Sequence, residues 1–111
     1  ADAAMIIASD PMANFNEPAR QHLASIPYVA FDPKETPTTR QAEVAFTVAT
    51  YGINVPGTVY RMDDVPIPLR PAFESPHPSD LQILEGIETR VKELKAIGMA
   101  SKASSLRPNA V

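Results

Sequence analysis

The chain has 111 residues, a formal net charge of -3, twelve prolines and no cysteine. This length allows one domain at most, with a small core. The lack of cysteine excludes disulfides, thiolate metal sites and cysteine nucleophiles. Without a basic excess we expect no nucleic acid partner, and no apolar run reaches the ~20 residues that cross a bilayer. We therefore expect a soluble protein of a reducing, cytoplasmic compartment.

The N-terminal third predicts a strand–helix–strand unit of the size of a βαβ crossover. Met5–Ala8 and Tyr28–Phe31 are short apolar runs typical of buried parallel strands. Between them, Asn16 is a suitable helix cap and Pro18 is favoured early in a helix. Ser25–Pro27 ends the predicted helix.

An Asp-Pro pair follows each of these two predicted strands. The pairs are Asp10-Pro11 and Asp32-Pro33. In open parallel sheets the ligand crevice lies at the carboxyl ends of the strands, where acidic residues bind ribose hydroxyls or base donors. Asp-Pro is also a common turn-builder. Both interpretations stay open from the pattern alone.

The middle of the chain predicts one further strand and a long irregular stretch. Thr36–Thr39 reads as a short connection whose hydroxyls suit either a turn or phosphate and sugar oxygens, and Val44–Val48 reads as the third strand. From Ala49 to about Pro78 the sequence has two glycines and six prolines. Proline cannot donate to a strand ladder, so we expect extended, edge-like chain at best. Such a long loop is unusual in a compact domain, and we expect it to lie over a cofactor or a partner domain.

The C-terminal part predicts an amphipathic helix. Ser79 and Gln82 form a capping-box pattern, and apolar residues then recur at helical spacing, as Leu84, Ile87, Val91 and Leu94. Gly98 is the expected stop. We therefore expect an α/β domain over residues 1–98 and a flexible tail over residues 99–111.

Other polar residues give weaker signals. Asp80 lies in the first turn of the last predicted helix, where the helix dipole favours a carboxylate whether or not it has a further role. Gly52 and Gly57 lack the spacing of a phosphate-binding loop. His22 and His77 lie on different elements, without metal-ligand spacing. We therefore expect no metal site in this chain.

The predicted elements form only part of a sheet. Three parallel strands with flanking helices, a proline-rich extended segment and a C-terminal helix indicate an α/β, partial Rossmann-like fold. Both outer strand edges and one sheet face would remain uncovered. The sequence also begins without methionine. We therefore expect more protein on the N-terminal side.

Five segments resemble the molybdopterin-dinucleotide oxidoreductases of the formate dehydrogenase and dimethyl sulfoxide reductase type. Within this family the resemblance is to the B subunits of formylmethanofuran dehydrogenases. The run Gly-Thr-x-Tyr-Arg-Met-Asp-x-Val-Pro-Ile is the most specific. The resemblance covers about residues 1–96 and corresponds to roughly the C-terminal quarter of such a subunit. The segments are Ile6–Pro11, Ile26–Pro27, Asp32–Lys34, Thr36–Thr39 and Gly57–Ile67.

The resemblance implies a role in holding one arm of a molybdopterin guanine dinucleotide cofactor. Asp10, Asn14, Asp32 and Asp80 match polar positions of the family near the cofactor, and Asp10 and Asp80 match contacts to its guanine end. Glu43 stands where relatives have Asp, and Phe31 where they often have a polar residue. The full set of implied cofactor-binding residues is Asp10, Pro11, Asn14, Asp32, Thr36 and Asp80.

The resemblance also implies the activity of a larger assembly. The metal ligand and catalytic residues of the family lie upstream, so this stretch alone is not expected to be catalytic. In the whole subunit, tungsten or molybdenum in a bis-pterin site would reduce carbon dioxide to formate in methanogenesis. Implied partners are the rest of the subunit and amidohydrolase-like and ferredoxin-like subunits.

Two other functions remain open. One is a non-redox structural subunit of a formyltransferase/hydrolase complex that has lost the metal cofactor; a metal-ligating cysteine upstream would distinguish the two. The other is a small receiver-like module, which needs a lysine late in the chain at the strand edge. Lys92, Lys95 and Lys102 lie on the last predicted helix or the tail instead, which disfavours it.

Overall fold

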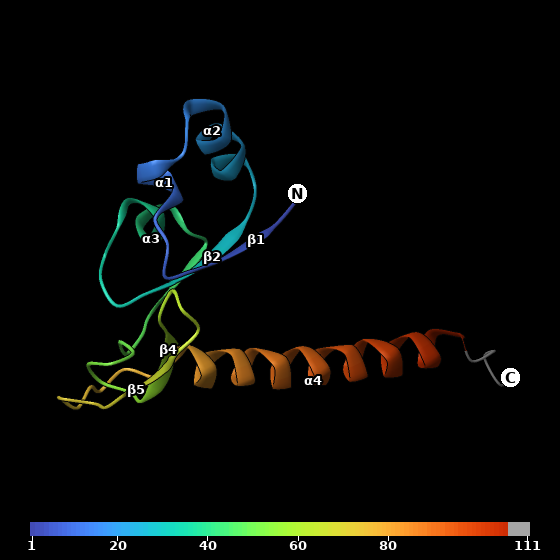
Figure 1. Cartoon of the computed structure of the whole chain (residues 1–111). Helices are drawn as coiled ribbons and strands as arrows, with labels where there is room; N and C mark the ends of the chain where they lie inside the picture. The colour runs from blue at the N-terminus through green and yellow to red at the C-terminus, as the bar shows by residue number, and fades with distance from the viewer. Residues whose placement is uncertain (107–111) are drawn as a thin grey trace, which may run out of the picture. The chain divides into compact units, whose positions relative to one another are not determined.

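The structure is a computed structural model that describes the backbone of residues 1–106 and side chains through residue 99. It divides into two compact units, one of residues 1–80 and one that begins at Leu81. Figure 1 shows the elements in chain order. They are β1 (Ala4–Ile7), α1 (Pro11–Asn14), α2 (Glu17–Ser25), β2 (Tyr28–Asp32), α3 (Pro37–Gln41), β3 (Val44–Thr47), β4 (Gly57–Tyr60), β5 (Pro66–Leu69) and α4 (Asp80–Leu106).

Three parallel strands form the main sheet, in the order β1-β2-β3. Met5 pairs with Val29, and Val29 with Val44, so β2 is the central strand. The expected α/β fold with a three-stranded parallel sheet is therefore confirmed. All three strands point the same way, and their carboxyl ends form one edge of the sheet.

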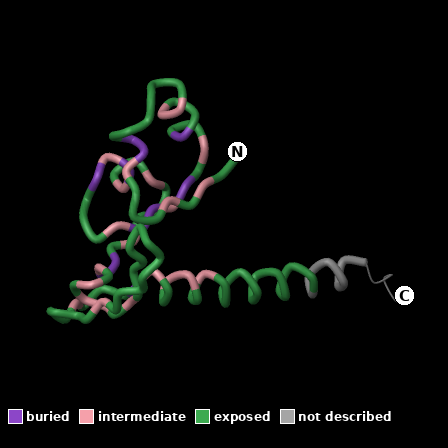
Figure 2. The backbone as a smooth tube through the Cα atoms, viewed as in Figure 1, coloured by how far each residue is buried: buried purple, intermediate pink, exposed green. Residues whose placement is uncertain are grey.

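The core lies between this sheet and the short helices. Met12 of α1 and Leu23 of α2 are buried against Tyr28 and Ala30 of β2. The buried positions in Figure 2 are concentrated around these elements, which Figure 1 shows as α1, α2 and α3 beside the sheet. Because side chains alternate along a strand, these residues share one face of the sheet.

Helix α2 forms as the sequence predicts. The Asn16 side chain accepts a 3.1 Å hydrogen bond from the Ala19 backbone N–H, which satisfies one of the free donors at the helix start. Pro18 lies in the first turn, where its missing N–H has no consequence. The helix ends at Ser25, and Ile26 is extended.

Two short helices were not predicted. The sequence pattern treats Asp10-Pro11 as a strand stop and Thr36–Thr39 as a connection, yet α1 and α3 each begin at the proline of such a segment. Proline at the first helical position is pre-organised for a helix. Thr36 adds a capping box, because its Oγ1 accepts from the Thr39 N–H while Thr39 Oγ1 accepts from the Thr36 N–H.

The stretch predicted to be irregular contains an antiparallel hairpin of β4 and β5. The Arg61 N–H donates to the Val65 carbonyl at 3.0 Å, so this pair is a hydrogen-bonded one. Bonded and non-bonded pairs alternate along an antiparallel ladder. Pro66 and Pro68 therefore fall in non-bonded pairs, and neither interrupts the ladder with its missing donor. The prediction that this stretch is extended is therefore confirmed. The prediction that it contains no paired strand is wrong.

Helix α4 begins at Asp80, as the Ser79 cap predicts, but it continues through Gly98 to Leu106. The helix end predicted at Gly98 is therefore wrong. A flexible tail over 99–111 stays a prediction, and its last five residues, 107–111, lie outside the described part of the chain. No helix among the described residues is both long and apolar enough to span a bilayer.

Candidate functional site

Asp10 lies between β1 and α1, at the carboxyl edge of the sheet. Its Oδ1 accepts a 2.6 Å hydrogen bond from the Thr38 hydroxyl and a 3.3 Å bond from the Thr38 backbone N–H. The Thr38 hydroxyl also accepts from the Met12 N–H at 3.1 Å, and this side chain is completely buried. Asp10 thus connects the start of α1 to α3.

Tyr28 extends the same network beneath the edge. Its hydroxyl donates a 2.7 Å hydrogen bond to the Thr38 carbonyl. Burial, and after it the nearby Asp10 charge, raises the pKa of Tyr28 above its ordinary value, because both disfavour a phenolate. Tyr28 therefore stays a neutral donor and fixes the position of α3.

Three further predicted site residues have local roles in this structure. Pro11 is buried as the first residue of α1, and the Asn14 amide donates to the Asp10 carbonyl at 2.9 Å. Thr36 is buried, and its hydroxyl caps α3. These contacts shape the edge around Asp10. Contacts of these residues with a cofactor stay predictions.

Asp32 and Asp80 lie close together at the same edge. Asp32 ends β2, and its Oδ1 accepts a 3.0 Å hydrogen bond from the Lys34 N–H. The Ala49 N–H donates to the Pro78 carbonyl at 2.8 Å, which holds the chain just before Asp80 beside the end of β3. The structure thus brings together two carboxylates that are 48 positions apart in the sequence.

The environment of Asp80 is unfavourable for a charged carboxylate. Its Oδ1 is buried without a hydrogen-bond donor among the described residues. Burial raises the pKa of Asp80 above its ordinary value, and the negative charge of Asp32 raises it further. This oxygen can accept a hydrogen bond that the described part of the chain does not supply.

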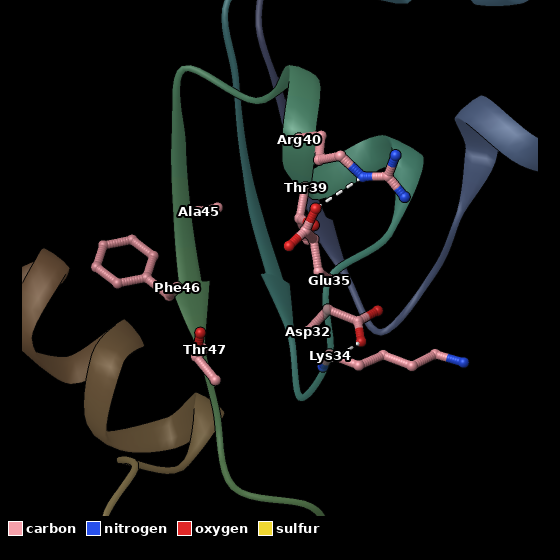
Figure 3. Close-up of a pocket in the computed structure, with 8 residues that line it drawn as sticks. All are labelled: Asp32, Lys34, Glu35, Thr39, Arg40, Ala45, Phe46 and Thr47. Atoms are coloured by element: carbon pink, nitrogen blue, oxygen red, sulfur yellow. Dashed lines mark hydrogen bonds and ion pairs between the residues drawn. The ribbon is translucent and has the colours of Figure 1, made fainter.

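A pocket of about 400 Å³ opens beside Asp32. Two of its lining residues, Arg40 and Glu35, point toward each other in Figure 3, and the Arg40 Nε and Glu35 Oε1 atoms are 2.9 Å apart. The pocket combines acidic, basic, hydroxyl and aromatic groups, a mixture that suits a polar ligand with a flat ring. Its lining residues are Asp32, Lys34, Glu35, Thr39, Arg40, Ala45, Phe46 and Thr47.

The described residues contain no group of three or more His, Cys, Asp or Glu side chains that could hold a metal ion. His22 lies 3.0 Å from the Ala1 carbonyl, and the backbone N–H of His77 donates to Ser75 Oγ. The two histidines therefore have different hydrogen-bond partners.

The sequence pattern did not single out the role of Thr38 and Tyr28. Thr38 was only one of several hydroxyls in a predicted connection, and Tyr28 was only a strand residue. Thr38 lies 28 positions from Asp10. No spacing rule connects residues across such a distance, so this pair required the fold.

Comparison with known proteins identifies relatives of this chain. No family model matches the sequence. The B subunit of the tungsten-containing formylmethanofuran dehydrogenase 2 of Methanocaldococcus jannaschii is 46% identical over 95 residues, which are 84% of this chain and 22% of that protein. The protein of the same name from Methanococcus maripaludis is 41% identical over 96 residues, 85% of this chain and 22% of its own length.

The chain spans about a fifth of the length of these relatives, and the similarity extends over most of its own. The resemblance seen in the sequence is thereby confirmed. The chain is homologous to the B subunit of formylmethanofuran dehydrogenase, an oxidoreductase subunit of the molybdopterin family.

Proposed function

We propose that this chain is the cofactor-holding segment of a tungsten or molybdenum bis-pterin oxidoreductase subunit of the formylmethanofuran dehydrogenase type. In this proposal the Asp32–Asp80 edge binds the guanine end of one dinucleotide arm. The observation that carries it is the 46% identity to the B subunit of a tungsten-containing enzyme over 84% of the chain. The parent subunit would reduce carbon dioxide to formate, with the amidohydrolase-like and ferredoxin-like subunits as partners.

The carboxylate acceptors at this edge suit a guanine base. Guanine presents an exocyclic amino group as a donor, and a carboxylate is an acceptor only. The buried Oδ1 of Asp80 lacks a donor among the described residues, and an unsatisfied buried acceptor costs about 1–3 kcal/mol. A guanine donor at this oxygen would remove that cost.

The other residues of the edge would position the base and its phosphates. The Lys34 N–H holds one oxygen of Asp32, which fixes the orientation of this carboxylate. Lys34 itself lines the pocket, where its ammonium group suits a diphosphate. The bound cofactor would supply the redox chemistry, and these side chains would supply its fixed position.

The test uses Asp32→Asn and Asp80→Asn in the full-length subunit, purified in its complex. We expect each variant to bind the guanine dinucleotide about ten- to a hundred-fold more weakly, since a hydrogen bond to a charged group contributes roughly 1.5–3 kcal/mol. Mass spectrometry of the released nucleotide and elemental analysis of tungsten and molybdenum measure occupancy. Glu74→Gln, at an exposed carboxylate of the same unit, is the matched control.

Two outcomes would contradict the proposal in different ways. Full nucleotide and metal content in both aspartate variants would reject the site. A wild-type subunit that contains neither pterin nor metal would reject the redox function and leave the structural-subunit alternative. Asp10→Ala is a poorer test, because the loss of its bonds to Thr38 would disturb the fold as well.

A further inference from the structure

Two residues that line the pocket beside Asp32, Glu35 and Arg40, form an ion pair with each other. Glu35 precedes Thr36, the cap of α3, and Arg40 lies in the last turn of this helix. The two side chains therefore come from opposite ends of α3, and Figure 3 draws their contact as a dashed line. An internal carboxylate thus occupies Arg40 in a pocket to which the proposed function assigns a phosphate-bearing cofactor.

This ion pair is a weak one. Glu35 Oε1 lies 2.9 Å from Arg40 Nε, and the two side chains are 73% and 62% exposed. Pairs so open to water contribute little to stability, because water and salt screen the charges and both long side chains lose conformational freedom. Replacing Glu35 at Arg40 by another anion therefore costs little.

The rest of the Arg40 guanidinium is available to a ligand. Its two terminal amino groups have no hydrogen-bond acceptor among the described residues. A guanidinium binds phosphate oxygens through two parallel N–H bonds, which are stronger than one contact to an exposed carboxylate. The backbone of α3 is held in place, because Tyr28 donates to the Thr38 carbonyl and the Thr38 hydroxyl donates to Asp10. Only side chains need to move when Arg40 changes its partner.

The charges that line the pocket balance while Glu35 contacts Arg40. Lys34 and Arg40 are positive, and Asp32 and Glu35 are negative. A diphosphate would be attracted by Arg40 and repelled by Glu35. The Asp32 carboxylate is oriented by the Lys34 N–H, whereas no hydrogen bond within the described residues holds the Glu35 carboxylate. With Glu35 turned into water, two positive groups and one negative group remain, so the pocket favours an anion.

We propose that Glu35 is an internal competitor for Arg40, and that the diphosphate of a guanine dinucleotide displaces its carboxylate. This inference rests on the proposed function, which supplies the dinucleotide. Arg40 then binds phosphate oxygens, and Glu35 holds the guanidinium at the pocket before binding, at the expense of some affinity. Glu35 is therefore a residue whose removal tightens the binding of the ligand.

Calorimetric titration of the full-length subunit, in its complex and prepared without its cofactor, tests this assignment. The probes are GDP, which carries guanine and a diphosphate, and guanosine, which lacks only the diphosphate. We expect Arg40→Gln to weaken GDP binding about ten- to a hundred-fold. We expect Glu35→Gln to tighten it about two- to fivefold, the effect of removing an exposed ion pair. Neither substitution should change the binding of guanosine.

Glu35→Asp separates competition for Arg40 from the total charge of the pocket. This substitution keeps the negative charge but shortens the side chain by one methylene, which removes the 2.9 Å contact with Arg40. Competition predicts that Glu35→Asp tightens GDP binding as Glu35→Gln does. It also predicts that most of the gain from Glu35→Gln disappears in the Arg40→Gln background. GDP binding by Glu35→Asp equal to that of the wild type would overturn the proposal.

Other results would also overturn it, and they are distinguishable from a failure of the proposed function. If GDP and guanosine bind the wild type equally well, the pocket does not hold the diphosphate, although the guanine site survives. Unchanged GDP binding by Arg40→Gln leads to the same conclusion. If neither probe binds the wild type, the guanine site is rejected together with this inference. Glu74→Gln, at an exposed carboxylate that does not line the pocket, is the matched control and should leave both titrations unchanged.

Discussion

The Thr38 hydroxyl donates a 2.6 Å hydrogen bond to Asp10 while it accepts a 3.1 Å bond from the Met12 backbone. One buried oxygen thus connects the end of β1, the start of α1 and the first turn of α3. Asp10 therefore has a structural role at the sheet edge, independent of any ligand. This role changes which variants can test the site and which test the fold.

Thr38→Val removes the shared hydroxyl with little change in side-chain shape. Asp10 Oδ1 would keep only its longer bond to the Thr38 N–H, and the Met12 N–H would lose its acceptor. We expect the local stability of β1 and α1 to fall by about 1–3 kcal/mol, the cost of buried polar groups without partners. Hydrogen–deuterium exchange of the full-length subunit, resolved by peptide, measures this change.

Thr58→Val is the control for this substitution, because Thr58 is an exposed strand residue of β4. Hydrogen–deuterium exchange of β1 and α1 in the Thr58→Val variant should match that of the wild type. Equal protection of β1 and α1 in Thr38→Val and wild type would show that the hydroxyl does not hold the edge together.

Asp80→Asn should stabilise the edge in a pH-dependent way. Burial and the Asp32 charge raise the pKa of Asp80 above its ordinary value of 3.8. Between the unfolded and the raised folded pKa, the folded state binds more protons, so wild-type stability falls as pH rises through this window. The stabilisation by Asp80→Asn should be absent below pH 3.8 and complete above the raised pKa.

The measurement is hydrogen exchange of the cofactor-free subunit across this pH range, corrected for intrinsic exchange. Asp32→Asn is a useful second variant, because it removes the negative charge beside Asp80 and leaves the burial of Asp80 unchanged. It should reduce the pH dependence at Asp80 without abolishing it. A constant difference between Asp80→Asn and wild type at all pH values would contradict the raised pKa.

Local signals were sufficient to predict much of this fold. Tyr28–Phe31 predicts β2 because an apolar, β-rich run needs only its own residues, and Asn16 predicts the start of α2 through a contact three positions away. Asp10 and Asp32 were likewise predicted to lie at one edge of the sheet, because parallel strands share a direction. These inferences depend on short-range chemistry or on a general rule of sheets.

Other features depend on a balance between a residue's local preference and the structure around it, which a local sequence pattern does not show. Gly98 was expected to end a helix, but glycine costs only about 1 kcal/mol relative to alanine within one, and α4 continues. Pro66 and Pro68 argued against a strand, yet their spacing of two keeps both in non-bonded pairs. The closeness of Asp32 and Asp80 depends on how the segment before α4 returns to β3.

Ala8 offers a test of backbone strain next to the site. It follows β1 with a φ of 53°, in the left-handed region that favours glycine. This conformation costs an L-residue roughly 1–2 kcal/mol, of which the greater flexibility of unfolded glycine offsets about 0.5–1 kcal/mol. We expect Ala8→Gly to raise local stability by up to about 1 kcal/mol and Ala8→Val to lower it, as read from hydrogen exchange of β1.

Ala13→Gly is the matched control, since Ala13 is an exposed residue of helix α1 without positive φ. Glycine should be destabilising there, with the opposite sign to Ala8→Gly. If Ala8→Val were as stable as the wild type, the left-handed conformation at Ala8 would be wrong.

The isolated chain of 111 residues is expected not to fold well alone. Among the described residues, seventeen large apolar side chains are exposed, whereas only seven apolar residues are buried. Folded domains are stable by only about 5–15 kcal/mol, so a chain with so little buried core has a small margin against its conformational entropy. Circular dichroism of the purified chain should show no cooperative thermal transition, while the full-length subunit should show one. A sharp transition of the isolated chain would mean that its few buried residues are sufficient for a stable fold.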